Sequence, residues 1–225
     1  LTDSNDHYST ARDIALMSRE LILKYPEIYK YTKIWMEDIT HVTKQGSKQF
    51  TLSNTNKLLR QFDGCTGLKT GSTSTAKYCL SATANRGGID MIAVLLASPD
   101  SKTRFSEAAA MLNYGFSRCR LYKDEKPPAL TPLKVLKGKG DSVPLYYDGG
   151  FSYLDMDGAD LSAITRKENI PDKIDAPVEK GDVVGSLDYY LGEEKIGSVS
   201  ICAGERVLGA GFADYIKAAA KMWLW

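Results

Sequence analysis

Apolar residues recur at helical spacing near the start of the chain, and Pro26 ends the pattern. Thr10 followed three positions later by Asp13 is typical of a capping box, which satisfies free backbone N–H groups at the beginning of a helix. The apolar positions of the pattern are Ile14, Met17, Leu21 and Ile22. The pattern therefore predicts a helix that begins near Thr10 and ends before Pro26.

Runs with the character of strands follow this helix. Residues 29–36 and 46–53 predict two strands around a polar turn, and residues 54–64 predict a loop or a short helix. Residues 76–84 and 89–97 predict two more strands, which pair antiparallel because a short turn with two glycines separates them. Since residues 89–97 are strongly apolar, we expect both faces of that strand to be covered.

A second helical pattern begins at Ser101, a residue type that is common at helix N-caps. Its apolar positions, spaced by three or four, are Phe105, Ala108, Ala109, Leu112 and Phe116. We expect this helix to lie on the sheet that the preceding strands form.

Composition changes at residues 122–132, where charges and three prolines interrupt all periodicity. Turn signals then separate short β-branched and aromatic runs, which is typical of a small all-β sandwich or barrel. Residues 209–225 return to helical spacing, with an apolar face opposite a face that carries Lys217 and Lys221. Together with two tryptophans near the end, this pattern fits a helix that lies in a membrane surface; a helix packed on its own domain is the alternative.

The overall composition excludes several classes of function. The chain has 29 basic and 28 acidic residues, so no nucleic-acid partner is indicated. Four widely spaced cysteines and two histidines predict no metal site, and no cofactor is expected. Each cysteine is interpreted as a small buried hydrophobe, with a disulfide as the alternative in an exported protein. No apolar run approaches the ~18 residues of a transmembrane helix.

The tripeptide Lys69, Thr70 and Gly71 lies on a further predicted strand, residues 68–72, and is the candidate site. A phosphate-binding loop is excluded because Leu68 stands where that motif needs glycine. Two interpretations remain from the residues alone: an exposed strand lysine beside a turn, or the K-T-G element of serine-acylating penicillin-recognising enzymes. The second has a physical basis, because a peptide can add to a strand edge while a lysine and a hydroxyl bind its terminal carboxylate.

The residues around this tripeptide resemble one protein family over almost the whole chain. They are similar, in order and spacing, to the second half of the catalytic domain of low-molecular-mass penicillin-binding proteins, which are D-alanyl-D-alanine carboxypeptidases. The segments that carry the resemblance are residues 7–22, 54–59, 63–84, 101–116 and, in the β-rich region, 176–191.

The resemblance implies a domain organisation. Residues 1–121 would be the second half of an α/β domain of the transpeptidase and β-lactamase type, an antiparallel sheet with flanking helices whose N-terminal half is missing. Residues 122–208 would be a small all-β domain. Residues 209–225 would be an amphipathic helix on the membrane surface.

The resemblance also implies a reaction. A serine would attack the penultimate D-alanine carbonyl of a peptidoglycan stem pentapeptide, D-alanine would leave, and water would hydrolyse the acyl-enzyme. β-Lactam antibiotics would mimic the dipeptide and trap the serine. The protein would be exported to the outer face of the cytoplasmic membrane and held there peripherally by its C-terminal helix.

Each residue of the K-T-G element has a role implied by its motif position. Lys69 would bind the terminal carboxylate and help to tune proton transfer. Thr70 would hydrogen-bond the same carboxylate, and Gly71 would leave room for the ligand. The backbone N–H of Ser72 would supply one of two oxyanion donors.

Three further residues have two interpretations each. Arg104 matches an arginine that orients the carboxylate in the family, and a solvated helix residue is the alternative. Asn54 and Asn56 would either line the cleft or cap a loop.

The nucleophile is not found in these residues. Ser74 and Lys77 spell S-x-x-K, but they follow the K-T-G element and lead into a strand, whereas the family's nucleophile opens a helix. No other S-x-x-K begins a credible helix, and no S-x-N occurs. Since the chain starts at Leu1 within a pattern, we expect it to be a piece of a longer protein or the partner of an N-terminal fragment that carries the serine. On its own it should not acylate.

Two alternative functions remain open. A related β-lactamase is one, although the second β domain and the terminal helix argue against it. The other is a non-enzymatic scaffold near the cell wall, in which the K-T-G element would be a remnant.

Overall fold

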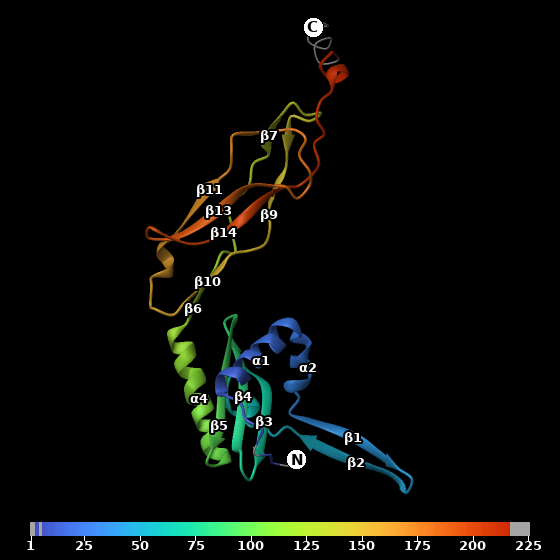
Figure 1. The fold of residues 1–225 in the computed structure, drawn as a ribbon, viewed down its shortest axis with the longest axis vertical. Helices are drawn as coiled ribbons and strands as arrows, with labels where there is room; N and C mark the ends of the chain where they lie inside the picture. Colours follow the sequence, from blue (N-terminus) through green and yellow to red (C-terminus); the bar gives the residue numbers. More distant parts are fainter. Residues whose placement is uncertain (1–2, 5, 217–225) are drawn as a thin grey trace. The chain divides into compact units, whose positions relative to one another are not determined.

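A computed structural model describes residues 3–4 and 6–216 of the chain. The chain divides into two compact units, Leu1–Arg120 and Leu121–Trp225. Each unit has its own hydrophobic core. Figure 1 follows the chain through both units from blue to red.

An antiparallel sheet of three strands forms the centre of the first unit (Figure 1). Strands β3 (Cys65–Thr73), β4 (Lys77–Arg86) and β5 (Ile89–Ser98) are neighbours in the order of the sequence. The predicted strands and the turn between β4 and β5 are therefore confirmed. β3 and β5 are the edge strands, and within the described residues neither pairs with a strand on its outer side.

Helices contact this sheet from both faces. Helix α4 (Ser101–Arg118) packs on the face that carries Leu80, and helix α1 (Ala11–Lys24) contacts β4 and β5. The Ser18 hydroxyl of α1 hydrogen-bonds the Ser81 hydroxyl of β4 at 2.7 Å. Since successive strand side chains point to opposite faces, Leu80 and Ser81 mark the two sides. The buried core residues are Leu58, Phe62, Leu80, Ala82, Ala84, Ala93, Leu95, Phe105, Ala108 and Leu112.

Helix α1 begins with the predicted capping box. The Thr10 hydroxyl accepts a hydrogen bond from the Asp13 backbone N–H at 3.1 Å, and the Asp13 carboxylate accepts one from the Thr10 backbone N–H at 3.3 Å. Tyr25 is the C-cap, and a single 3₁₀ turn, η1 (Pro26–Ile28), follows. Both ends of the helix therefore agree with the sequence pattern.

The predicted strand at residues 29–36 is wrong. Helix α2 (Tyr29–Thr32) continues directly from the 3₁₀ turn, and strand β1 (Met36–Thr43) starts only at the last residue of the predicted range. The aromatic and threonine residues of this segment favour strands in general, but tertiary contacts decide the outcome. The Thr32 hydroxyl donates to the Thr66 carbonyl at 2.7 Å, which ties the helical turn to β3.

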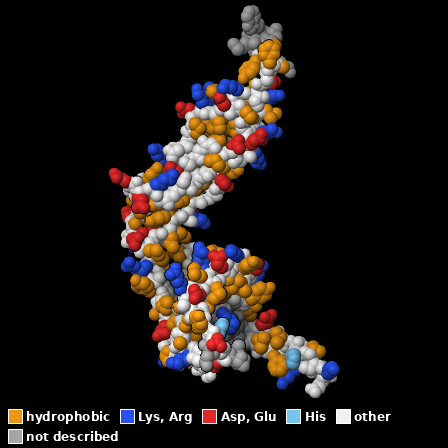
Figure 2. Space-filling model, viewed as in Figure 1, with side chains coloured by type: hydrophobic (Ala, Val, Ile, Leu, Met, Phe, Trp, Pro, Cys, Tyr) orange, Lys and Arg blue, Asp and Glu red, His pale blue; other side chains and the backbone are white. Residues whose placement is uncertain are grey.

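Strand β1 pairs with β2 (Gly46–Ser53) in an antiparallel hairpin, so the second predicted strand is confirmed. All residues of both strands are exposed. Directly opposed residues share a face, so Ile39 and Phe50 lie on one side together with Leu52. Figure 2 shows hydrophobic side chains along this hairpin. The short helix α3 (Leu58–Gln61) comes next, one of the two alternatives that the sequence allows.

The second unit consists mainly of short strands, as the spacing of the turn signals predicts. Its strands form a four-stranded sheet in the order β11-β13-β14-β9, a three-stranded sheet β12-β7-β8 and a two-stranded sheet β10-β6. The elements are β6 (Arg120–Lys123), β7 (Leu133–Leu136), β8 (Ser142–Val143), β9 (Leu145–Tyr147), β10 (Ser152–Asp155), η2 (Leu161–Ala163), β11 (Ile164–Asn169), β12 (Lys173–Asp175), β13 (Val183–Leu191) and β14 (Glu194–Ala203). Large apolar side chains such as Leu187, Tyr189 and Ile201 fill its core.

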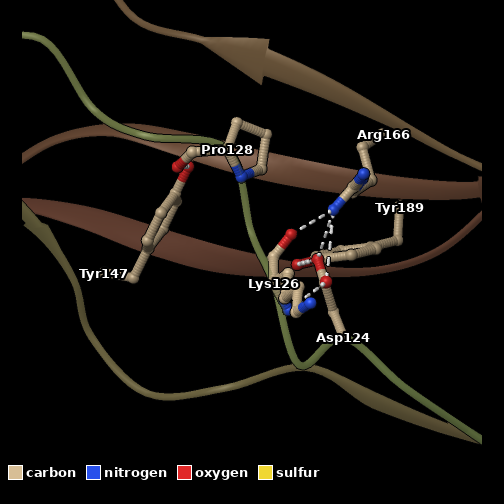
Figure 3. Close-up of polar contacts among 6 residues, drawn as sticks. All are labelled: Asp124, Lys126, Pro128, Tyr147, Arg166 and Tyr189. Atoms are coloured by element: carbon tan, nitrogen blue, oxygen red, sulfur yellow. Dashed lines mark hydrogen bonds and ion pairs between the residues drawn. The ribbon is translucent and has the colours of Figure 1, made fainter.

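A charged cluster around Asp124 lies at the edge of this core (Figure 3). The Asp124 carboxylate accepts hydrogen bonds from the Tyr189 hydroxyl at 2.8 Å and from the Arg166 guanidinium at 3.1 Å. Arg166 also donates to the Lys126 carbonyl at 2.9 Å. Burial would raise the pKa of Asp124, but the bonds from Tyr189 and Arg166 outweigh it and hold this pKa below its ordinary value. The cluster therefore fixes the first residues after β6 to strands β11 and β13.

The C-terminal segment begins its helix later than predicted. Gly209 forms a bridge with Gly138, and the described helical residues start at Phe212 rather than at residue 209. Glycine at positions 209 and 211 favours irregular backbone there. The rest of the predicted amphipathic helix, residues 217–225, lies outside the described residues. No helix in the described part is long and apolar enough to span a membrane.

Candidate functional site

One cavity of about 680 Å³ in the first unit brings the predicted site residues together. Lys69, Thr70, Gly71 and Ser72 reach it from β3, and Arg104 reaches it from the first turns of α4. The sequence predicted all five as site residues, although they are separated by more than 30 positions. The other lining residues are Trp35, Ser53, Asn54, Thr55, Lys57 and Ser101.

The cavity opens along the outer edge of β3. Alternation along the strand places Lys69 and Gly71 on one face, and Thr70 and Ser72 on the other. All four line the same cavity because β3 has β4 on one side and no strand on its other side in the described chain. The backbone groups of this edge are the kind that an extended peptide can pair with.

Lys69 is an exposed cation without a carboxylate beside it. Its ammonium donates to the carbonyl of Thr70, and within the described residues it has no ion pair. A lysine in an internal ion pair would contribute to the stability of the fold. The ammonium is instead available to an anion in the cavity.

Gly71 is not required by its own surroundings. Its φ lies outside the left-handed region, and a Cβ added to it would meet no atom within 4 Å. Gly67 on the same strand is different, because a Cβ there would lie 2.8 Å from Thr32. Neither its backbone conformation nor packing against the described residues explains glycine at position 71, so the free space belongs to the cavity.

Arg104 is buried, which differs from the solvated alternative considered for it. The side chain is 5% exposed, and one terminal nitrogen, Nη1, donates to the Gly71 carbonyl at 3.2 Å and to the Cys79 carbonyl at 3.1 Å. These two residues are partners in the β3–β4 pairing. Burial also lowers the pKa of this guanidinium. The arginine therefore holds the backbone of the K-T-G strand in place.

The loop before α3 contributes residues that the sequence left undecided. The Asn54 amide donates to the carbonyls of Thr32 and Ile34, and the Asn56 amide donates to the Gly67 carbonyl at 2.9 Å. Both asparagines therefore fix the loop, and Asn54 also lines the cavity.

Thr55, between these asparagines, is a cavity residue that sequence reasoning missed. Its hydroxyl lies 2.5 Å from the Thr70 hydroxyl. The only signal for it was its position between two asparagines of the loop, and neither periodicity nor a motif singled it out.

The charge of the cavity is positive. Lys57, Lys69 and Arg104 line it, and none of its lining residues is acidic. The helix α4 begins at the same place, and its N-terminus adds further partial positive charge. The described residues contain no group of three or more potential metal-ligating side chains. All four cysteines are free thiols. The arrangement suits an anionic ligand held by hydrogen bonds and a lysine.

Ser74 and Lys77, which spell S-x-x-K, do not form a helical nucleophile motif. Residues 74–76 form the turn between β3 and β4, and Lys77 is the first residue of β4. The two side chains therefore do not lie one helical turn apart, and the interpretation of this sequence as a coincidence stays a prediction.

Two protein-family models match the chain. Residues 1–100 match the family described as D-alanyl-D-alanine carboxypeptidase, and residues 116–208 match the C-terminal domain of penicillin-binding protein 5. The two matched regions fall in the first and the second unit in turn, apart from the residues at their junction.

Curated relatives match over almost the whole chain. D-alanyl-D-alanine carboxypeptidase DacF of Bacillus subtilis is 35% identical over 96% of this chain and 55% of its own length. DacA of Haemophilus influenzae is 30% identical over 99% of this chain and 54% of its own length. The chain thus spans about half the length of the curated relatives it matches.

Solved structures agree in fold. Penicillin-binding protein 5 of Haemophilus influenzae covers 92% of this chain at 27% identity with a TM-score of 0.63, and the match covers 59% of that protein. A peptidoglycan synthesis regulatory factor, PBP3, of Streptococcus pneumoniae covers 91% of this chain at 25% identity with a TM-score of 0.59, and the match covers 59% of that protein.

Proposed function

We propose that this chain, which belongs to the D-alanyl-D-alanine carboxypeptidase family of penicillin-binding proteins, is the substrate-binding part of a serine carboxypeptidase. The enzyme would remove the terminal D-alanine from peptidoglycan stem pentapeptides and be acylated by β-lactam antibiotics. The observation that carries this proposal is the cavity at the free edge of β3. It combines a lysine without an ion pair, a hydroxyl and a glycine that no contact requires, as far as the described residues go.

The cavity residues act on the terminal carboxylate of the peptide. The extended peptide pairs with the edge of β3, and its carboxylate accepts charge-assisted hydrogen bonds from the Lys69 ammonium and the Thr70 hydroxyl. Gly71 leaves space for the ligand's backbone. Arg104 acts on the carboxylate through β3, because its Nη1 donates to the carbonyls of Gly71 and Cys79.

The acyl transfer needs a serine from outside these residues. Its Oγ attacks the penultimate D-alanine carbonyl carbon, the peptide bond breaks, and D-alanine leaves with a proton. The backbone N–H of Ser72 is one donor to the oxyanion that forms. Water then hydrolyses the ester and regenerates the serine.

The surface of the first unit is consistent with a second, nucleophile-bearing part. The outer edge of β5 pairs with no strand in the described residues, so a strand can add there. Helix α1 leaves Leu16, Met17 and Leu23 more than half exposed. Exposed apolar residues so close together are typical of a surface that another segment covers.

The remaining regions have proposed roles in placing the enzyme. Residues 1–121 form the second half of the catalytic domain, and residues 122–208 form the β domain. Residues 209–225 would bind the outer face of the cytoplasmic membrane of the cell that exports the protein. Phe212 and Tyr215, both at least half exposed, fit the apolar side of such a segment.

Labelling with a fluorescent penicillin tests this proposal. The complete protein, with the nucleophile-bearing part present, should form a covalent adduct, whereas this chain alone should form none. The labelled protein should sediment with membranes, and a form that ends at residue 208 should remain in the supernatant. A complete protein that takes no label would contradict the carboxypeptidase proposal, and a labelled chain would place the nucleophile within these 225 residues.

A further inference from the structure

The loop that carries Asn54 and Asn56 presents one threonine to the K-T-G strand. The two asparagine side chains bond to backbone groups of the unit, and Asn56 is only 2% exposed. Thr55 lies between them, is exposed, and lines the cavity. The asparagine side chains therefore hold the loop in place, and the threonine between them lines the cavity.

The Thr55 hydroxyl contacts the hydroxyl that is proposed to bind the ligand. The two oxygens, Thr55 Oγ1 and Thr70 Oγ1, are 2.5 Å apart. Thr70 is 8% exposed, and within the described residues its hydroxyl has no other hydrogen-bond partner. The orientation of the Thr70 hydroxyl therefore depends on Thr55.

The chemistry of two hydroxyl groups decides how this contact acts. A threonine hydroxyl has one proton to donate and can also accept hydrogen bonds. A carboxylate only accepts, so it needs the Thr70 proton to point into the cavity. When the Thr55 hydroxyl donates to Thr70, the Thr70 proton is left for the carboxylate. Hydrogen bonds in such a chain also strengthen one another.

We propose that Thr55 is a positioning residue that orients the Thr70 hydroxyl toward the carboxylate of the ligand. This inference rests on the proposed function, because it takes the ligand to be a carboxylate bound at Lys69 and Thr70. It assigns to Thr55 a role that acts through Thr70, without contact between Thr55 and the reacting carbonyl.

The test compares two ligands that differ only at the carboxylate. In the complete protein, we expect Thr55→Val to lower the second-order rate constant of acylation by benzylpenicillin about five- to tenfold, the effect of one lost hydrogen bond between two neutral groups. With benzylpenicillin methyl ester, which has no carboxylate, the same substitution should change the rate less than about twofold. Thr55→Ser keeps the hydroxyl and should react with the acid at close to the original rate.

Thr165→Val is the matched control, because Thr165 is an exposed strand threonine in the second unit. It should leave both rates unchanged. Equal slowing with the acid and the ester would show that Thr55 only maintains the loop, and no slowing with either would also overturn the inference. The unsubstituted protein is tested with benzylpenicillin before any variant is compared. If it is not acylated, the proposed function itself fails.

Discussion

At the scale of single residues, a functional role is clearest where the fold itself does not require the residue type that occupies the position. Lys69 has no carboxylate partner in the described chain, and Gly71 has neither a left-handed backbone nor a close neighbour. Arg104 is the opposite case, because its guanidinium is buried and bonded to two backbone carbonyls. The K-T-G element could be predicted from sequence because its residue types fit carboxylate binding. Thr55 could not be predicted from sequence, because its role depends on a contact with Thr70, which lies 15 positions later in the sequence.

Asp124 gives a prediction for the pH dependence of stability. Its pKa is below the ordinary value in the folded chain, so it contributes stability above an ordinary aspartate pKa of about 3.9 and loses it as pH falls through the folded value. We expect Asp124→Asn to lower the free energy of unfolding by about 1–3 kcal/mol at pH 7 and by much less near pH 2. Urea unfolding of the two proteins at both pH values measures the difference. Asp157→Asn, at an exposed loop position, is the control. An Asp124→Asn effect that does not shrink in acid would contradict the assignment.

At the scale of elements, sequence periodicity worked where an element buries one face and failed where tertiary contacts decide. Helix α4 and strands β4 and β5 follow their apolar patterns because those patterns become the core. Helix α1 also forms as its pattern predicts, although it buries only Ser18 and Ile22 in the described residues. Residues 29–32 read as a strand by composition, yet they form a helix that Thr32 ties to the Thr66 carbonyl. The hairpin of β1 and β2 was half predicted: β2 has the predicted bounds, whereas the residues of β1 lie almost entirely after the predicted strand.

Helix α4 and the K-T-G strand are joined by Arg104, which leads to a prediction about stability. Arg104→Met keeps much of the side-chain volume but leaves the carbonyls of Gly71 and Cys79 without this donor. We expect the free energy of unfolding to fall by about 1–3 kcal/mol, and acylation of the complete protein to slow with it. Arg118→Met, in the exposed last turn of the same helix, should change stability by less than about 0.5 kcal/mol. Full stability combined with lost acylation would instead mean that Arg104 contacts the ligand directly.

At the scale of the whole molecule, the chain combines two units that have different roles in the proposed enzyme. The first unit carries the cation, the hydroxyl and the free strand edge, and it leaves apolar side chains of α1 exposed. The second has a closed core of its own, in which the Asp124 cluster fixes the residues that follow β6. The division into an α/β part and a β-rich part could be predicted from the change in composition at residues 122–132. The location of the nucleophile could not, because no pattern in these residues supplies it.

The central claim is that Lys69 binds the carboxylate of the ligand and does not stabilise the fold. The most direct measurement is the rate of acylation of the complete protein by a fluorescent penicillin, before and after Lys69→Ala, together with the free energy of unfolding. We expect the rate to fall at least about 30-fold, the loss of about 2 kcal/mol from a truncated charge pair. Stability should change by less than about 0.5 kcal/mol, and Lys134→Ala, at an exposed position of β7, should affect neither quantity. An unchanged acylation rate, or a loss of stability that matches the loss of rate, would contradict the claim.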